Sequence, residues 1–136
     1  MSQLVFGGIW VILVTVFIQW LIASGSKAKQ PGAIPGKIDT SLSHESFVFR
    51  AHRTFHNSIE NVPFFLAAAF LAIFVGVESQ WFVVSIWAFA FARIVHMLLF
   101  YGIATEKNPS PRSYFFMLGV IANAVVLVQV GIALLA

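Results

Sequence analysis

Four long apolar runs, separated by short polar segments, dominate the sequence. The first, third and fourth cover Leu4–Ala23, Trp81–Ala104 and Tyr114–Ala136. The second, Val62–Val77, is shorter, but no helix breaker separates it from Ser46–Asn61 before it. Because roughly 20 apolar residues cross the hydrocarbon core of a bilayer, the pattern predicts four transmembrane helices.

Turn-forming residues indicate where these helices end. Ser24-Gly25-Ser26 is expected to end the first helix, and Pro31-Gly32 and Pro35-Gly36 mark the loop after it. Glu78–Gln80 forms a tight turn, and Asn108–Pro111 the last connection. We expect one domain, 1–136, with helices at about 4–24, 44–77, 80–105 and 111–135. The fold class is therefore all-α: an integral membrane four-helix bundle, left-handed and up-and-down.

Composition narrows the class of protein further. The chain has 136 residues, of which 60% are hydrophobic and 10% charged, whereas soluble domains average about 25% charged. These figures exclude a soluble domain, a disordered chain and a nucleic-acid-binding module. The count of zero Cys excludes a disulfide scaffold, a thiolate metal site and a cysteine nucleophile.

Basic residues lie on one side of the predicted membrane. Most are in or beside the first and third connections: Lys27, Lys29, Lys37, Arg50, Arg53, Lys107 and Arg112. The positive-inside rule then predicts that both long loops are cytoplasmic and that both termini lie on the opposite side of the membrane. The membrane expected is a bacterial inner membrane or that of the endoplasmic reticulum. Because the charges follow the first apolar run, we interpret that run as a transmembrane helix and not as a signal peptide.

Ionisable residues inside the spans form three clusters near the cytoplasmic side. Such residues are costly in a bilayer and generally mark function. On helix two, Arg50, Arg53, Asn57 and Glu60 share one stripe, and His56 borders it; Arg93 and His96 are one turn apart on helix three, and Arg112 and Ser113 begin helix four.

The charge balance of these clusters favours an anionic ligand. Four arginines, Arg50, Arg53, Arg93 and Arg112, accompany one carboxylate within the spans, Glu60. A structural ion-pair network would be closer to neutral, and Arg is suited to bidentate recognition of carboxylates. Anionic lipid headgroups and structural contacts between helices are the alternatives. We predict no metal site, because His52 and His56 have the spacing of two ligands but lack a third.

These motifs resemble the MAPEG family, the membrane-associated proteins in eicosanoid and glutathione metabolism, and are closest to its prostaglandin E synthase and glutathione transferase branch. Arg50-Ala51-His52-Arg53 with Asn57, Glu60 and Pro63 resembles the family's helix-two signature. Arg93 with His96, and Pro111-Arg112-Ser113, resemble its motifs on helices three and four.

The resemblance implies a homotrimer that binds glutathione between subunits near the cytoplasmic interface. It makes Arg112 a thiolate-stabilising residue and Ser113 a second catalytic residue. The glutathione-binding residues that we predict are Arg50, Arg53, His56, Asn57, Glu60, Arg93, His96 and Tyr101.

Two positions depart from the family pattern. Tyrosines that are common in the family fall on Phe100 and Phe116, with Tyr101 and Tyr114 nearby. Either these neighbours replace the family tyrosines or part of the glutathione site is altered.

The resemblance implies a membrane-bound glutathione transferase or peroxidase, with glutathione as co-substrate. Its second substrate would be a lipophilic electrophile or a lipid hydroperoxide that arrives from the membrane lipid. The alternatives are a non-catalytic lipid-binding member of the family and a structural membrane protein.

Overall fold

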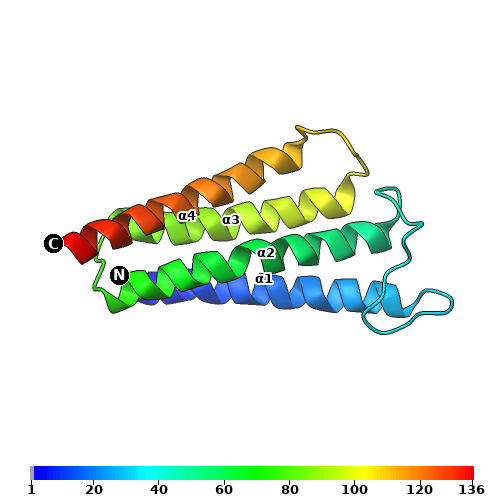
Figure 1. Cartoon of the computed structure of the whole chain (residues 1–136), viewed down its shortest axis with the longest axis horizontal. Helices are drawn as coiled ribbons and strands as arrows, with labels where there is room; N and C mark the ends of the chain where they lie inside the picture. The colour runs from blue at the N-terminus through cyan, green and yellow to red at the C-terminus, as the bar shows by residue number, and fades with distance from the viewer. Residues whose placement is uncertain (1) are drawn as a thin grey trace.

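The chain forms four long helices that run up and down beside one another (Figure 1). This computed structural model describes residues 2–136. The helices are α1 (Ser2–Ala28), α2 (Phe47–Phe74), α3 (Gln80–Gly102) and α4 (Pro111–Leu135). Each is long and apolar enough to cross a membrane. The predicted all-α, four-helix membrane bundle is therefore confirmed.

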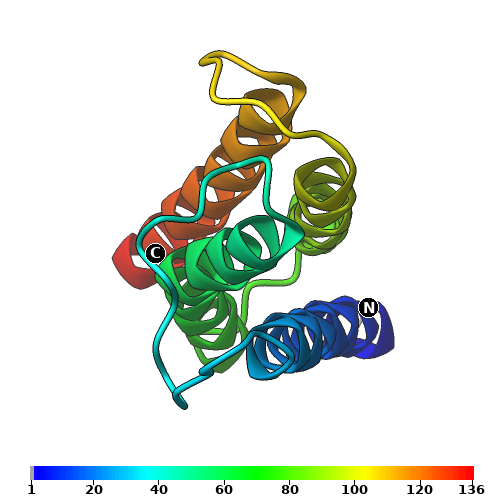
Figure 2. The same cartoon turned by 90° about the vertical axis from the view of Figure 1, so that its right-hand side faces the viewer.

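The connections divide the bundle into two different ends. Both termini and the short α2–α3 turn lie at one end, and the two long connections lie together at the other, which we call the loop end (Figure 1). The end-on view shows α2 in the middle of the group (Figure 2). Since α2 and α3 each pack against the other three helices, these two helices carry most of the interior.

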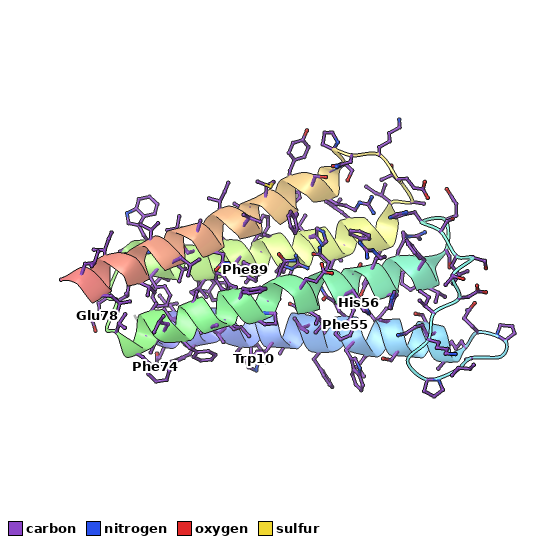
Figure 3. The ribbon with its side chains drawn as sticks, viewed as in Figure 1. Trp10, Phe55, His56, Phe74, Glu78 and Phe89 are labelled. Atoms are coloured by element: carbon purple, nitrogen blue, oxygen red, sulfur yellow. The ribbon has the colours of Figure 1, made fainter. Side chains whose placement is uncertain are left out.

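The interior combines alanines and branched aliphatic residues with a stacked aromatic pair. The rings of Phe65 and Phe89 stack with centroids 3.7 Å apart and an angle of 4° between their planes. Large apolar side chains instead cover the outside: Phe74 is 84% exposed and Trp10 63% (Figure 3). A surface of this kind is stable in lipid and not in water.

Local backbone chemistry fixes the tight α2–α3 turn. The amide of Val77 donates to the Ala72 carbonyl and that of Gly76 to the Ile73 carbonyl, which is the Schellman pattern. Gly76 has a φ of 77°, in the left-handed region that a side chain disfavours. The Ser79 side chain then accepts from the amide of Trp81 and caps α3.

Helix α1 extends four residues beyond its expected end at residue 24. We expected Ser24-Gly25-Ser26 to stop it, but the helix continues to Ala28. A glycine inside a helix costs only about 1 kcal/mol. The Ser26 hydroxyl donates to the Ala23 carbonyl at 3.0 Å, and Lys27 in the last turn complements the helix dipole.

Helix α2 begins at Phe47, three residues later than expected, because turns occupy the chain before it. The amide and the hydroxyl of Ser41 both donate to Asp39 Oδ1, at 2.8 and 2.7 Å. These hydrogen bonds lower the pKa of the Asp39 carboxyl below its ordinary value. A further turn joins the amide of Ser46 to the Ser43 carbonyl. Helices α2 and α3 also end three residues earlier than expected, whereas α4 has the expected bounds.

A glycine sets the distance between α1 and α3, and we predict that Gly8→Ala destabilises the bundle. A Cβ at Gly8 would overlap Cγ2 of Ile86, whose side chain is fully buried and has no free space to move into. Overpacking of this kind costs about 1–3 kcal/mol. The measurement is the midpoint of thermal unfolding in detergent. Gly25→Ala, where nothing lies within 4 Å of the added atom, is the matched control and should not lower the midpoint.

Candidate functional site

A cleft opens at the loop end, between α2, α3, α4 and the α3–α4 connection. Its volume is about 620 Å³, within the range of small-molecule sites. Five of the predicted site residues line it: Arg53, Asn57, His96, Arg112 and Ser113. The structure therefore brings together residues from three helices that the sequence predicted to act together.

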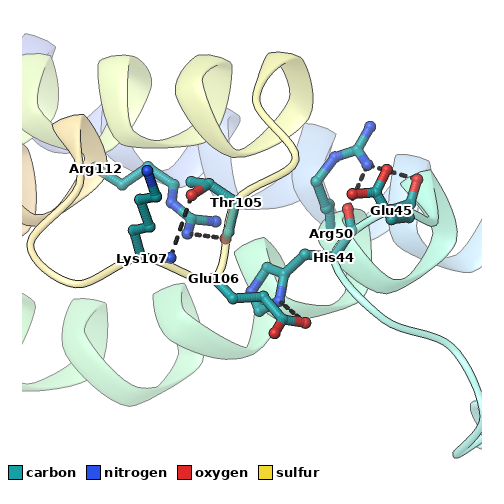
Figure 4. Close-up of polar contacts among 7 residues, drawn as sticks. All are labelled: His44, Glu45, Arg50, Thr105, Glu106, Lys107 and Arg112. Atoms are coloured by element: carbon teal, nitrogen blue, oxygen red, sulfur yellow. Dashed lines mark hydrogen bonds and ion pairs between the residues drawn. The ribbon is translucent and has the colours of Figure 1, made fainter.

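Arg112 is the most firmly held of these side chains. Its Nη2 donates to the Thr105 carbonyl at 2.7 Å (Figure 4). Its Nε donates to Ser110 Oγ at 3.3 Å. Its guanidinium carbon lies 4.0 Å from the centroid of the Phe100 ring. The remaining nitrogen, Nη1, is buried without a hydrogen-bond partner. None of these contacts is with a carboxylate, so the charge of the group is not neutralised by an ion pair.

Ser113 lines the cleft, but its hydroxyl also caps α4. Ser113 Oγ accepts from the amide of Ser110 at 3.1 Å and donates to Asn108 Oδ1 at 3.3 Å. Ser110 and Ser113 thus form a capping box. This box, with Pro111 at the first helical position, fixes where α4 begins and hence where Arg112 projects.

Arg50 has a different place from the other predicted binding residues. Its Nη1 donates to the carbonyls of His44 and Glu45, the latter at 2.9 Å (Figure 4). Its Nη2 donates to the Tyr101 carbonyl at 3.3 Å. It does not line the cleft. Arg50 therefore joins the segment before α2 to the end of α3.

Arg93 is buried between helices. It is 3% exposed, and its Nη2 donates to the Ser58 hydroxyl at 2.8 Å. It lies behind the cleft and not in its lining. In the single chain, Arg93 therefore links α3 to α2. This is the alternative in which the arginine makes a structural contact between helices.

The stripe on α2 is divided between the cleft and the outer surface. Arg53 and Asn57 line the cleft, whereas His56 and Glu60 are exposed and lie outside it (Figure 3 for His56). Among the described side chains the one ion pair is His44 with Glu106, at 3.5 Å. The arginines of the site therefore have no carboxylate partner within the described part of the chain.

The neighbouring tyrosines do not take the places of the two phenylalanines. Phe100 and Phe116 line the cleft. The Tyr101 hydroxyl is buried without a partner, and its ring packs edge-on against Phe47 at 5.4 Å. Tyr114 is 69% exposed. The lining of this cleft therefore contains aromatic rings without a phenol.

Several lining residues were not predicted from the sequence. They are His44, Glu106, Lys107, Asn108, Pro109, Ser110 and Met117, whereas Phe100 and Phe116 were noted as positions of the family tyrosines. Most belong to the α3–α4 connection, where adjacency in sequence to Arg112 is the one signal that could have indicated them. His44 had no such signal, because turns and the Arg50 contacts bring it to the cleft.

Fold and site together define a multi-pass membrane protein with an arginine-bearing cleft at one end of its bundle. Comparison with protein families matches residues 4–132 to the MAPEG family. The chain therefore belongs to the MAPEG family, whose members include glutathione transferases and related enzymes, and also non-enzymatic proteins. Neither a comparison with curated proteins nor one with solved structures found a match.

We predict that Arg50→Ala loosens the segment before α2. The substitution removes three donated hydrogen bonds from the carbonyls of His44, Glu45 and Tyr101. Hydrogen bonds from a charged group contribute about 1.5–3 kcal/mol, so amide exchange around residues 44–46 should accelerate at least about tenfold. Hydrogen exchange with mass spectrometry measures this.

Arg50→Lys separates geometry from charge. Lysine keeps the positive charge but cannot fork between three carbonyls as a guanidinium does. We expect it to exchange nearly as fast as the alanine variant. Protection equal to that of the wild type in both variants would contradict the role of Arg50 as a link.

Proposed function

We propose that this protein is a membrane-bound glutathione transferase, with glutathione peroxidase as the related activity. The observation that carries the proposal is the Arg112 guanidinium, a residue of the cleft lining that has no carboxylate partner in the described part of the chain. Membership of a family that includes glutathione-dependent enzymes supports it.

Charge complementarity supports glutathione as the ligand. The tripeptide has two carboxylates, one ammonium group and one thiol, and the cleft lining has the cations Arg53, Lys107 and Arg112 with the carboxylate Glu106. Arg53, with Asn57 beside it, is suited to bind a carboxylate and a peptide amide. Binding of an anion would also compensate the positive charge of the arginines that lack a carboxylate partner.

Arg112 is proposed to stabilise the thiolate of bound glutathione. A cation beside sulfur favours the ionised form, which is the nucleophile. In conjugation, the thiolate sulfur bonds to an electrophilic carbon of the second substrate, and either a leaving group departs with its bonding pair or, at an activated double bond, the π electrons take up a proton. In hydroperoxide reduction, two glutathione molecules give glutathione disulfide, and the hydroperoxide becomes an alcohol and water.

The second substrate is proposed to come from the membrane lipid. Phe116 and Met117 line the cleft, and Met117 is 50% exposed on α4, which is one of the spans. The cleft thus offers an apolar side within the bilayer and a polar side at the loop end. Holding a soluble peptide and a lipophilic electrophile together provides catalysis by proximity. We place the loop end in the cytoplasm because it carries most of the basic residues.

The α2 surface supports the proposal that the protein assembles as a homotrimer. His56 and Glu60 are exposed on the single chain although they lie within a membrane span. Ionisable groups in a span generally face protein or water and not lipid. A second copy packed on this face would cover both groups and bring Glu60 near a neighbouring cleft, as the family resemblance implies.

We predict that Arg112→Ala removes the thiolate signal of bound glutathione. The test is ultraviolet absorbance of the thiolate in purified protein at saturating glutathione, with binding measured separately by calorimetry. Loss of the buried cation should reduce the thiolate fraction at neutral pH by at least about tenfold. Tyr114→Phe, whose hydroxyl lies outside the cleft, is the control and should resemble the wild type.

Each contrary outcome excludes a different part of the proposal. Absence of glutathione binding in the wild type would exclude both activities and leave a structural or lipid-binding protein. Binding with a thiolate signal that does not depend on Arg112 would keep the ligand and exclude the mechanism. Binding without turnover of any lipophilic electrophile or hydroperoxide would favour the non-catalytic alternative.

We predict that a cysteine on the α2 face cross-links three subunits. Phe64, one turn beyond Glu60, is 72% exposed, and the native chain has no cysteine. Phe64→Cys treated in membranes with a trifunctional maleimide should give a trimer band on denaturing gels. Val128→Cys on α4, whose exposed residues near that position are apolar, is the control. Equal cross-linking at both positions, or none at Phe64→Cys, would contradict this assembly.

A further inference from the structure

The Phe100 ring is a common packing surface for three residues of the cleft. The guanidinium carbon of Arg112 lies 4.0 Å from its centroid, the His96 ring 5.0 Å and the His44 ring 6.3 Å. These residues come from α4, from α3 and from the segment before α2. Phe100 is thus the side chain on which three separate parts of the site meet.

The ring connects Arg112 to a membrane-spanning helix. The two hydrogen-bond acceptors of the guanidinium, Thr105 and Ser110, belong to the α3–α4 connection and to the cap of α4. Neither contact fixes the guanidinium relative to the body of α3. Phe100 lies in the last turn of α3. Contact with its ring therefore fixes the position of the guanidinium relative to His96 on that helix.

The chemistry of this contact differs from that of an ion pair. A cation above an aromatic face is attracted by the ring quadrupole. A carboxylate in that place would occupy the N–H donors of the guanidinium and neutralise its charge. The ring does neither, and Nη1 is left buried and without a partner in the part of the chain that the structure describes. The arginine is therefore oriented by the ring while its charge is not neutralised.

We infer that Phe100 is a positioning residue that holds the Arg112 guanidinium by a cation–π contact in the orientation that acts on the ligand thiol. The inference rests on the proposed function for the identity of the ligand. The contact itself is a property of the protein alone. Its two parts can therefore be tested separately.

The first experiment measures the contact without glutathione. In protein labelled with ¹⁵N-arginine, the side-chain N–H resonances of Arg112 should be shifted upfield by the ring current of Phe100. The resonances are assigned by their loss in Arg112→Lys. The upfield shift should disappear in Phe100→Leu and persist in Phe100→Tyr, which keeps an aromatic face. A wild-type Arg112 without any upfield shift would overturn the inference, whatever the fate of the variants.

The second experiment measures the consequence at saturating glutathione. The thiolate absorbance is recorded against pH for the wild type, Phe100→Leu and Phe100→Tyr. A cation–π contact at a buried site implies that Phe100→Leu lowers the thiolate fraction at neutral pH by roughly three- to tenfold. Phe100→Tyr should restore most of it. Recovery with the aromatic variant distinguishes positioning from simple loss of packing.

A matched control removes a ring from the same helix. Phe91 packs edge-on against Phe115 at 6.1 Å and lies outside the cleft. Phe91→Leu should leave the thiolate curve unchanged. A Phe100→Leu curve that superimposes on the wild type would overturn the inference and leave the proposed function intact. If the wild type itself forms no thiolate, the proposed function fails, and the arginine resonances still decide whether Phe100 holds Arg112.

Discussion

Three arginine side chains of the bundle direct their guanidinium groups at neutral oxygen atoms. Arg50 binds main-chain carbonyls, Arg93 binds a serine hydroxyl, and Arg112 binds a carbonyl and a serine hydroxyl. Each of these three arginines joins separate segments of the chain. Because the acceptors are dipoles and not carboxylates, these hydrogen bonds leave the positive charge uncompensated. The connections that hold the loop end together therefore also make it attractive to anions.

The four-helix architecture could be predicted from the sequence because a helix that crosses the bilayer needs a long apolar run. Four apolar runs of spanning length predict four helices, and those helices are observed. Helix ends were less predictable, since they depend on contacts that a hydrophobic pattern does not encode. Gly25 was expected to stop α1 and does not, whereas Gly76 does stop α2 because the turn needs its positive φ.

The position of the candidate site could be predicted from the sequence, but the role of every residue in it could not. Helical spacing correctly places Arg53 and Asn57 on one face, and both line the cleft. Spacing does not say where a long side chain ends: Arg50 shares the stripe, yet its guanidinium turns back to carbonyls outside the cleft. His44 reaches the cleft through tertiary packing. Only the folded chain could reveal this, because no local pattern encodes it.

The capping box at Ser110 and Ser113 has an electrostatic consequence for the whole cleft. It places the first turn of α4, the positive end of that helix's dipole, directly at the cleft. The negative end of α3 lies on the other side of the same connection, where the Arg50 guanidinium already binds the Tyr101 carbonyl. The positive terminus of α4 thus lies at the cleft, and one carbonyl of the negative terminus of α3 is bound by a cation. A zwitterionic ligand would enter this asymmetric field with a preferred direction, its anionic end turned toward α4.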